Sequence, residues 1–387
     1  MNNLINIENN TSSGFYSKRD LLITHGKGAS LFDAEGNQYI DCIGGQGAAN
    51  LGHAHPRVIE TISQQAARLI SCPEMLCNDQ RAQLQEKLLQ ISPGQMKHAF
   101  LCNSGTEAVE AAIKIARLST RKQKIIAAKR GFHGRTYAAL SATWERRYRK
   151  PFEPLVSGFE HIAYNNITQL QEILDDDTAA VILEIIQGEG GVNMGQREFL
   201  IKAQELCIQF GALLIIDEIQ TGFGRTGKMF ACQHYDIQPD IICLAKSIAG
   251  GIPMGAVLFN DRIENIAIGL HGSTFGGNPL ACAVSMTVIS EILDTDLLQH
   301  VEQSGTFLLE ELRKIQSPAI REIRGKGLMI GIELKTKNKP FLRALQDQGI
   351  LLLSAGSTVL RLLPPLVITR AQLERVIESF KKVFEND

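Results

Sequence analysis

The chain has 387 residues, of which 44% are hydrophobic and 21% are charged. This composition is typical of a globular protein with a sizeable buried core, and it excludes a disordered or fibrous chain. The 40 Lys and Arg residues and the 41 Asp and Glu residues leave a net charge of −1. The sequence therefore lacks the basic excess that is typical of proteins that bind nucleic acid or anionic membranes.

The cysteines and the first residues indicate a cellular compartment. Eight cysteines lie between Cys42 and Cys282 with no C-x-x-C pair, which in a chain of this size indicates reduced thiols in the cytosol. Residues 1–13 are rich in Asn and lack the charged and then apolar pattern of a signal peptide. The longest apolar runs, such as 179–186, are too short to span a bilayer. We therefore expect a cytoplasmic protein.

Short apolar runs without alternation predict strands that are buried on both faces, as in parallel sheets. Helical periodicity lies between the runs, for example over 107–117 and 199–210, so the sequence predicts an α/β fold with a mostly parallel central sheet. The predicted strands are 99–102, 125–128, 181–186, 212–216 and 241–245.

The two ends of the chain predict a second, smaller α+β domain. Residues 29–43 predict two strands joined by a turn. Amphipathic helices over 297–315 and 371–385 flank predicted strands at 327–334 and 350–353. We expect a large domain over residues 46–284, and a small domain that combines residues 1–45 with residues 285–387.

One glycine-rich segment, 222–227, matches the G-x-G-x-x-G pattern of dinucleotide-binding sites. That site needs its glycines in the tight turn between a strand and a helix. Here four residues separate Asp217, at the strand end, from Gly222, and no long helical repeat follows. A nicotinamide-dependent enzyme is therefore the weaker hypothesis.

Three features follow predicted strands, at the edge where open α/β sheets bind ligands. Ser104, Gly105 and Thr106 open a helix and offer hydroxyl groups and free amides to an anion, although an ordinary helix cap has the same residues. Asp217 ends an apolar strand, where a carboxylate needs a partner. Lys246 follows another apolar strand, a setting that lowers the pKa of an amine and makes it nucleophilic.

An anion cradle, a carboxylate and a lysine together suit pyridoxal phosphate. The lysine of such a site bonds the cofactor aldehyde, the carboxylate pairs with the pyridinium nitrogen, and a helix N-terminus holds the phosphate. Each feature alone has a structural alternative: a cap at Ser104, a loop-capping role for Asp217, and a solvated surface group for Lys246.

The sequence resembles the class III (ω-amino) pyridoxal-phosphate-dependent aminotransferases of fold type I over nearly the whole chain. Within that family it is most similar to the subgroup of acetylornithine and carrier-protein-bound lysine aminotransferases. The most specific segments are 103–108, 131–136, 187–191, 217–222, 245–247 and 273–279.

The resemblance implies a role for each residue that matches a family motif around the cofactor. Lys246 would be the catalytic lysine, which bonds the cofactor and then moves the proton. The other cofactor-binding residues would be Ser104, Gly105 and Thr106 at the phosphate, Phe132 stacked on the ring, Asp217 at the ring nitrogen, Gln220 near the ring hydroxyl, and Thr274. Thr274 would contact the phosphate from the other subunit, which implies a homodimer with shared active sites. Core packing is the alternative for Phe132, and a turn is the alternative for Thr274.

The resemblance also implies how the substrates bind. Arg135 would bind the carboxylate of the amino donor, and Arg361 would bind the α-carboxylate of glutamate or 2-oxoglutarate, since an arginine fork binds carboxylates with two hydrogen bonds. Glu189 would pair with Arg361 and mask it while the ω-amino donor is bound. Ser273 would also contact the substrate.

We therefore expect an enzyme that moves the terminal amino group of an Nα-blocked ornithine or lysine to 2-oxoglutarate, in arginine or lysine biosynthesis. Segments 44–53 and 142–152 resemble the subgroup that processes lysine attached to an amino-group carrier protein. The basic run Arg146, Arg147, Arg149 and Lys150 could meet an acidic carrier, although such runs are more often solvated.

The alternatives are a free ornithine or 4-aminobutyrate aminotransferase, more distantly a mutase or decarboxylase, and a catalytically silent regulator that binds the cofactor. We expect no metal site, because His53 and His55 have no further ligand run beside them.

Overall fold

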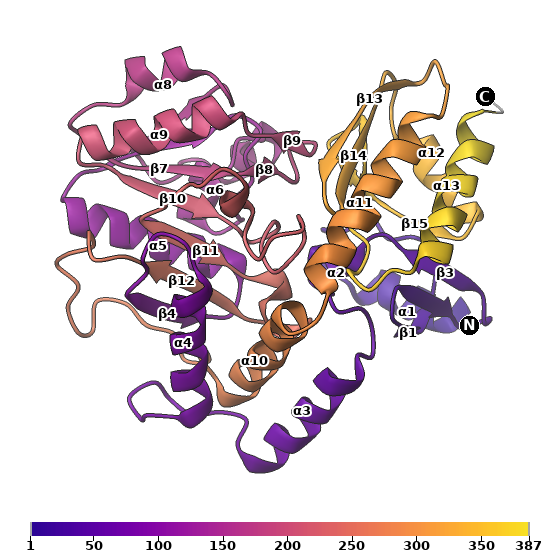
Figure 1. Cartoon of the computed structure of the whole chain (residues 1–387), viewed down its shortest axis with the longest axis horizontal. Coiled ribbons are helices and arrows are strands. Elements are labelled where there is room, and N and C mark those ends of the chain that lie inside the picture. Colours follow the sequence, from indigo (N-terminus) through magenta and orange to yellow (C-terminus); the bar gives the residue numbers. More distant parts are fainter. Residues whose placement is uncertain (1, 386–387) are drawn as a thin grey trace.

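The central sheet of the computed structural model, which describes residues 2–385, has seven strands in the order β4-β12-β11-β10-β7-β5-β6 (Figure 1). Neighbouring strands from β11 to β6 pair in parallel, whereas β12 runs antiparallel to both β11 and β4. The predicted mostly parallel sheet is confirmed, and β6 and β12 are additions to the predicted strands. The strands are β4 (His98–Cys102), β5 (Lys124–Ala128), β6 (Phe159–Ile162), β7 (Thr178–Glu184), β10 (Leu213–Asp217), β11 (Ile241–Leu244) and β12 (Gly255–Phe259).

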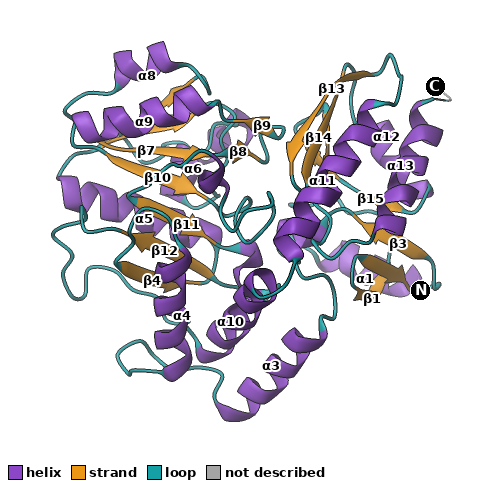
Figure 2. Cartoon of the chain, in the orientation of Figure 1, coloured by secondary structure: helices purple, strands orange, loops and turns teal. Residues whose placement is uncertain are grey.

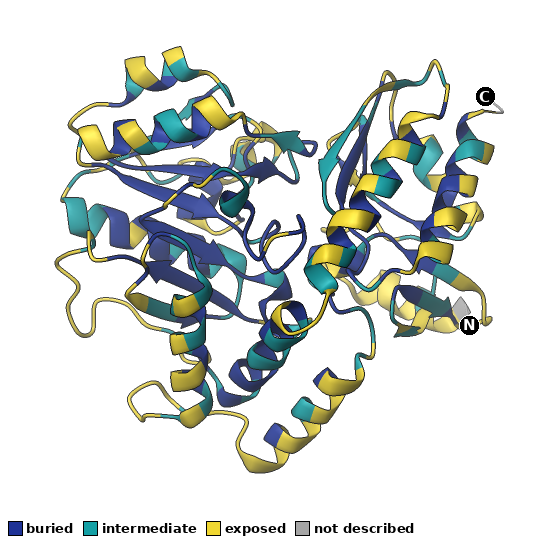
Figure 3. Ribbon diagram, in the orientation of Figure 1, coloured by how far each residue is buried: buried dark blue, intermediate teal, exposed yellow. Residues whose placement is uncertain are grey.

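Helices cover both faces of this sheet, which explains why its strands are apolar without alternation (Figures 2 and 3). Helix α5 (Gly105–Thr120) packs on β11 and β12, and α9 (Arg197–Gln209) packs on β10 and β7. Successive strand residues enter different cores: Ile215 belongs to the core beneath α5, and Ile216 to the core beneath α9. Further helices of this part are α2 (Gly44–Gly47), α3 (Pro56–Arg68), α4 (Asp79–Ile91), α6 (Tyr137–Ala142), α7 (Arg146–Arg149), η1 (Lys150–Phe152), α8 (Ile167–Ile173), η2 (Ala231–His234), η3 (Lys246–Ala249) and α10 (Pro279–Leu293).

A second sheet, with antiparallel strands in the order β13-β14-β17-β16, lies beside the first and is covered by α11, α12 and α13 (Figure 1). Its strands are β13 (Ile320–Lys326), β14 (Met329–Leu334), β16 (Leu353–Ala355) and β17 (Val359–Leu362). The helices are α11 (Leu297–Arg313), α12 (Lys339–Asp347) and α13 (Arg370–Phe384).

The N-terminal segment joins the C-terminal part through a third sheet. Strands β1 (Ile23–Lys27), β2 (Ser30–Asp33) and β3 (Gln38–Asp41) form an antiparallel sheet, and β3 pairs in parallel with β15 (Ile350–Leu351). Helix α1 (Asn2–Thr11) was not expected from the sequence. The domain boundaries stay a prediction, and the one after residue 284 falls within α10.

The glycine-rich segment 222–227 lies in a series of turns that runs from Gln220 to η2, instead of in a turn that opens a helix. Its Arg225 is buried and donates to the Leu328 carbonyl (3.0 Å) and to Asn50 Oδ1 (2.6 Å), so the segment connects distant parts of the chain. This geometry differs from that of a dinucleotide site.

All eight cysteines are free thiols. No helix among residues 2–385 combines the length and the apolar character that a membrane span requires.

Candidate active site

Three predicted site segments follow β4, β10 and β11, and the sheet places them at one edge. Strand β4 runs parallel to β11 because both pair antiparallel with β12. The carboxyl ends of β4, β10 and β11 therefore point the same way, and Ser104, Asp217 and Lys246 lie at this edge.

Lys246 is the first residue of η3, two positions after the end of β11, and its backbone adopts the left-handed region with φ of 48°. Non-glycine residues rarely adopt this conformation, and such strain is concentrated at functional sites. Its amine has no hydrogen bond or ion pair with the described part of the chain. Burial lowers the pKa of Lys246, as does the Arg361 guanidinium, whereas the Glu189 carboxylate raises it. The net lowering favours the neutral, nucleophilic amine.

Asp217 is buried at the end of β10, and two groups fix its carboxylate. His133 Nδ1 lies 2.8 Å from Oδ2, and the Ile219 amide donates to Oδ1 at 3.0 Å. Burial alone would lower the pKa of His133, but the hydrogen bond and the charge of Asp217, together with Glu184, raise it above its usual value. His133 therefore helps to hold the Asp217 carboxylate in one orientation.

Glu184 ends β7 in register with Asp217 on the neighbouring β10. Its carboxylate accepts hydrogen bonds from the amides of Phe132 (3.0 Å) and Gly188 (3.1 Å). Burial, with a contribution from the Asp217 charge, raises the pKa of Glu184. This side chain thus connects the loop that carries Phe132 to the loop that carries Glu189.

Residues 104–106 form the start of α5, and the side chain of Ser104 is its cap. Ser104 Oγ accepts from the Glu107 amide at 3.3 Å and lies 3.2 Å from the Glu107 carboxylate, so the capping alternative holds for this hydroxyl group. The first amides of a helix have no partner within it, which leaves those of Gly105 and Thr106 suited to a phosphate. A Cβ at Gly105 would lie 2.9 Å from Ile219, so glycine lets the helix start approach the turn after Asp217.

Arg361 is 2% exposed and links two predicted residues at the site. One terminal nitrogen lies 2.5 Å from the Glu189 carboxylate, and the other donates to Gln220 Oε1 at 3.0 Å. The structure therefore brings Glu189, Gln220 and Arg361 together. The roles assigned to these residues stay predictions.

Phe132 and Arg135 lie on the wall of the site toward α7. The Arg135 guanidinium lies 4.6 Å from the ring centroid of Tyr148 and 6.0 Å from that of Phe132, and the Arg135 side chain is exposed. A cavity of about 300 Å³ next to this wall is lined by Phe132, Trp144, Tyr148 and Glu189, with Arg130 and Arg147 among its charged residues.

Ser273 and Thr274 differ in their surroundings. Ser273 Oγ accepts from Asn103 Nδ2 and from the Gly276 amide, both at 3.0 Å, which ties it to the segment before Ser104. Thr274 is exposed.

His53 lies 2.7 Å from Asp41, and His55 lies 3.6 Å from Glu291, so each pairs with a carboxylate of its own chain.

His133, Glu184 and Arg324 were not predicted as site residues, although each touches a predicted site residue or its loop. His133 lies within the specific segment 131–136, and Glu184 ends an apolar strand as Asp217 does, so both had a signal in the sequence. Arg324 lies on β13, far from any motif.

Comparison with known proteins identifies the family: the model of the class III aminotransferases matches residues 15–384, and the chain belongs to this family. The [LysW]-aminoadipate semialdehyde transaminase of Deinococcus radiodurans is 44% identical over 383 residues, which are 98% of this chain and 89% of that protein. The acetylornithine aminotransferase of Methanopyrus kandleri is 44% identical over 365 residues, 94% of each chain. The crystal structure of the ornithine aminotransferase from Toxoplasma gondii ME49 matches with a TM-score of 0.96 at 34% identity, and the match covers 100% of this chain and 95% of that one.

The protein is thus a pyridoxal-phosphate-dependent aminotransferase, and the predicted fold class, enzyme class and cofactor are confirmed. Its residues fit the cofactor: Asp217 supplies a buried carboxylate, and within residues 2–385 the amine of Lys246 and the first amides of α5, at Gly105 and Thr106, have no hydrogen-bond partner. When bound, the cofactor supplies an electron sink for cleavage of a bond at the carbon that carries the amino group.

Proposed function

We propose that the enzyme moves the terminal amino group of an Nα-blocked ornithine or lysine to 2-oxoglutarate, giving a semialdehyde and glutamate, in arginine or lysine biosynthesis. The ion pair between Glu189 and Arg361, together with the exposed Arg135 guanidinium over the Tyr148 ring, carries this proposal. The names of the Deinococcus and Methanopyrus relatives support it.

The two substrates carry their α-carboxylates at different distances from the carbon that gives up or receives the amino group beside Lys246. In an ω-amino donor the α-carboxylate lies several carbons away from the terminal amine, and the exposed Arg135 would bind it. In glutamate and 2-oxoglutarate the α-carboxylate lies next to the reacting carbon, which requires a cation closer to the site. Arg361 is that cation, and Glu189 neutralises it until the second substrate arrives.

Lys246 and Asp217 would share the proton chemistry. The amine of Lys246 would move the proton between the carbon of the substrate and the carbon of the cofactor, a task that its lowered pKa favours. Asp217, held by His133, would keep a proton on the ring nitrogen. Phe132 would stack on the ring, Gln220 would lie near the ring hydroxyl, and Ser273 would contact the substrate.

The blocking group would occupy the cavity beside Phe132 and continue toward α7. Arg130 and Arg147 line this cavity, and Arg146 and Lys150 are exposed on the adjoining surface. Because the Deinococcus relative is named for a LysW-linked substrate, an acidic carrier protein is our preferred blocking group. These positive charges would attract such a partner.

The enzyme would act as a cytoplasmic homodimer with shared active sites. Apolar side chains near Thr274 are exposed in the single chain, including Ile268 and Phe275 (62%), and a second copy would cover them. Eight free thiols fit a reducing compartment.

The test is the visible absorbance of the purified holoenzyme after single amino donors are added. The absorbance should decay at least about tenfold faster with Nα-acetylornithine, Nα-acetyllysine or a carrier-linked lysine than with free ornithine or 4-aminobutyrate. Faster decay with free ornithine would favour the ornithine aminotransferase alternative, which the Toxoplasma structure makes the second candidate. A protein that binds the cofactor and reacts with no donor would be a silent regulator.

A further inference from the structure

Three residues form one row across the second sheet. Arg324 on β13 is in register with Gly331 on β14, and Gly331 is in register with Arg361 on β17. Residues that are directly opposite on neighbouring strands direct their side chains to the same face of a sheet. Both arginines reach the same loop, residues 188–192, which connects β8 (Ile186–Gln187) to β9 (Asn193–Met194) and carries Glu189.

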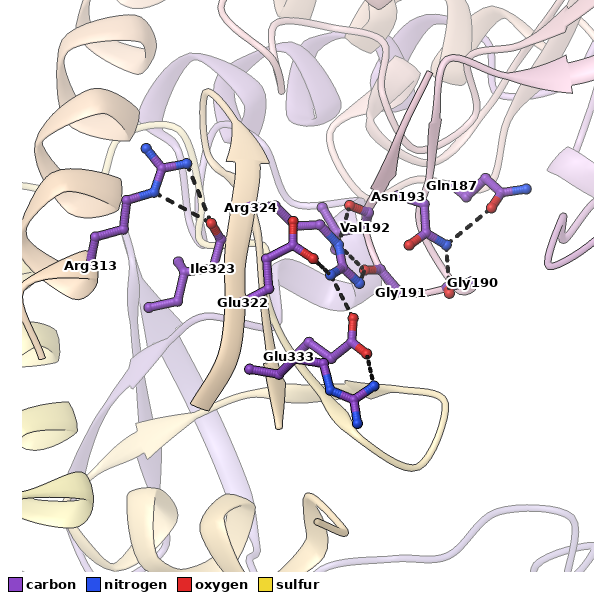
Figure 4. A network of polar contacts seen from close by, with 11 residues as sticks. Gln187, Gly190, Gly191, Val192, Asn193, Arg313, Glu322, Ile323, Arg324 and Glu333 are labelled. Atoms are coloured by element: carbon purple, nitrogen blue, oxygen red, sulfur yellow. Dashed lines mark hydrogen bonds and ion pairs between the residues drawn. The ribbon is translucent and has the colours of Figure 1, made fainter. Parts of the chain in front are cut away.

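Arg324 holds the backbone of this loop (Figure 4). Its Nε donates to the carbonyls of Gly191 and Val192, both at 3.1 Å, and a terminal nitrogen donates to the Gly191 carbonyl at 2.7 Å. The other terminal nitrogen lies 2.6 Å from both Glu322 and Glu333. The side chain is 11% exposed, so these charge-assisted contacts are largely protected from water.

The loop is held at its base and crowded at its far end. Asn193 Nδ2 donates to Gln187 Oε1 (3.1 Å) and to the Gly190 carbonyl (2.9 Å). Val192 adopts φ of 56°, a strained conformation for a β-branched residue. A Cβ at Gly331 would lie 2.8 Å from the Cβ of Val192, so the sheet and the loop are in close contact.

These contacts restrict how Glu189 can move away from Arg361. With the backbone of the loop fixed by Arg324, the Glu189 side chain must rotate, whereas a loosened loop could carry the whole residue away. With a loosened loop, the removal of Glu189 from Arg361 would cost less free energy. The unmasked Arg361 would then attract α-carboxylates.

We infer that Arg324 is a positioning residue for Glu189, and that it sets how strongly the enzyme prefers an ω-amino donor over glutamate. This inference rests on the proposed function, since it assumes that Glu189 masks Arg361 during one half of the reaction. Arg324 lies on the second sheet and Glu189 on a loop of the first part, so the preference depends on how these two parts are joined.

The test compares kcat/KM of the holoenzyme for Nα-acetylornithine with kcat/KM for glutamate, each measured in single-turnover reactions. Arg324→Lys keeps the charge beside Glu322 and Glu333 but loses the fork that binds two carbonyls. We expect the ratio of kcat/KM for glutamate to that for the ω-amino donor to rise about 3- to 30-fold. The matched control is Arg321→Gln, which removes a 60% exposed arginine that pairs with Glu333 at 3.2 Å, and the ratio should not change.

Glu189→Gln separates this inference from the proposed function. In that background Arg324→Lys should cause no further change in the ratio, because both variants act through one ion pair. If Glu189→Gln changes the ratio and Arg324→Lys does not, or if Arg324→Lys lowers both rates equally, the inference fails alone. If Glu189→Gln leaves the ratio unchanged, the switch in the proposed function fails as well.

A second variant covers the case in which Arg324→Lys does not fold. Glu333→Gln keeps the arginine but removes one of its two anchoring carboxylates. We expect a change in the same direction and of smaller size, and an unchanged ratio in this variant would overturn the inference.

Discussion

His133 and Asp217 form a buried pair in which the imidazole Nδ1 lies 2.8 Å from the carboxylate, although 84 positions separate them in the chain. With the Ile219 amide on its other oxygen, the carboxylate is held in one orientation. The carboxylate that we propose as the partner of the ring nitrogen is thereby fixed before the cofactor binds.

Asp217→Asn should therefore reduce the rate of amino transfer while cofactor binding persists. The amide has nearly the same shape but no charge, so it cannot keep a proton on the ring nitrogen. We expect a loss of about 10²- to 10⁴-fold in the rate of each half-reaction, measured by stopped-flow absorbance. His133→Asn should have a smaller effect, because it alters the orientation of the charge and leaves the charge in place. An Asp217→Asn enzyme with the rate of the wild type would contradict this role.

The lowered pKa of Lys246 predicts how cofactor uptake depends on pH. Only the neutral amine attacks the aldehyde, so the uptake rate of the cofactor-free protein should rise with pH, with a midpoint below the ordinary 10.5 of a lysine. Glu189→Gln removes a charge that raises this pKa, and the midpoint should move to lower pH. Arg361→Gln removes a charge that lowers it, and the midpoint should move to higher pH. The increase of visible absorbance gives the rates, and shifts of the same sign in both variants would refute the assignment.

The sequence predicted the parts of the site that follow from local patterns. Apolar runs gave β4, β5, β7, β10 and β11, because strands buried on both faces need apolar residues at every position. Strand β12 was missed although it is buried throughout and its five residues, GAVLF, are apolar like those of the predicted strands. Three residues separate it from the Gly-Gly turn. Its antiparallel direction depends on pairing with β4, more than 150 positions earlier in the chain.

Local sequence patterns did not predict the polar contacts around the site. The Ser104 hydroxyl caps α5. The sequence motif is equally consistent with capping and with phosphate binding. The contacts of His133 with Asp217 and of Arg324 with Gly191 join residues from separate elements. A single sequence shows which residues are present, but pairing across elements is determined by tertiary packing.

Thr274 offers a test of shared active sites. A homodimer of Thr274→Asp chains should be inactive if this residue faces the phosphate of the other subunit, because the added charge repels it. A homodimer of Lys246→Ala chains should be inactive too. After the two are mixed and allowed to exchange subunits, heterodimers hold one intact site, and random exchange should restore about a quarter of the wild-type activity. No recovery, with exchange verified by mass spectrometry, would place Thr274 at the site of its own chain.

His161 predicts how stability depends on pH. Its Nε2 lies 3.0 Å from the Ala142 carbonyl, and its ring packs beside Trp144 at 5.3 Å between centroids. Burial lowers the pKa of His161 to about 4. The unfolded chain, in which a histidine has its ordinary pKa of about 6.5, therefore binds more protons than the folded chain between these values.

Stability should consequently fall as the pH falls from about 6.5 toward 4. A histidine whose pKa is depressed in the fold stabilises the folded state fully only above its unfolded pKa. Allowing for partial exposure, His161 should account for about 1–2 kcal/mol of this loss. Urea unfolding at pH 7 and at pH 5 measures it, and His161→Gln should lose less stability on acidification than the wild type. His234, whose burial also lowers its pKa to about 4, gives a second variant with the same expected sign. Equal losses in the wild type and in both variants would show that neither imidazole is kept neutral by the fold.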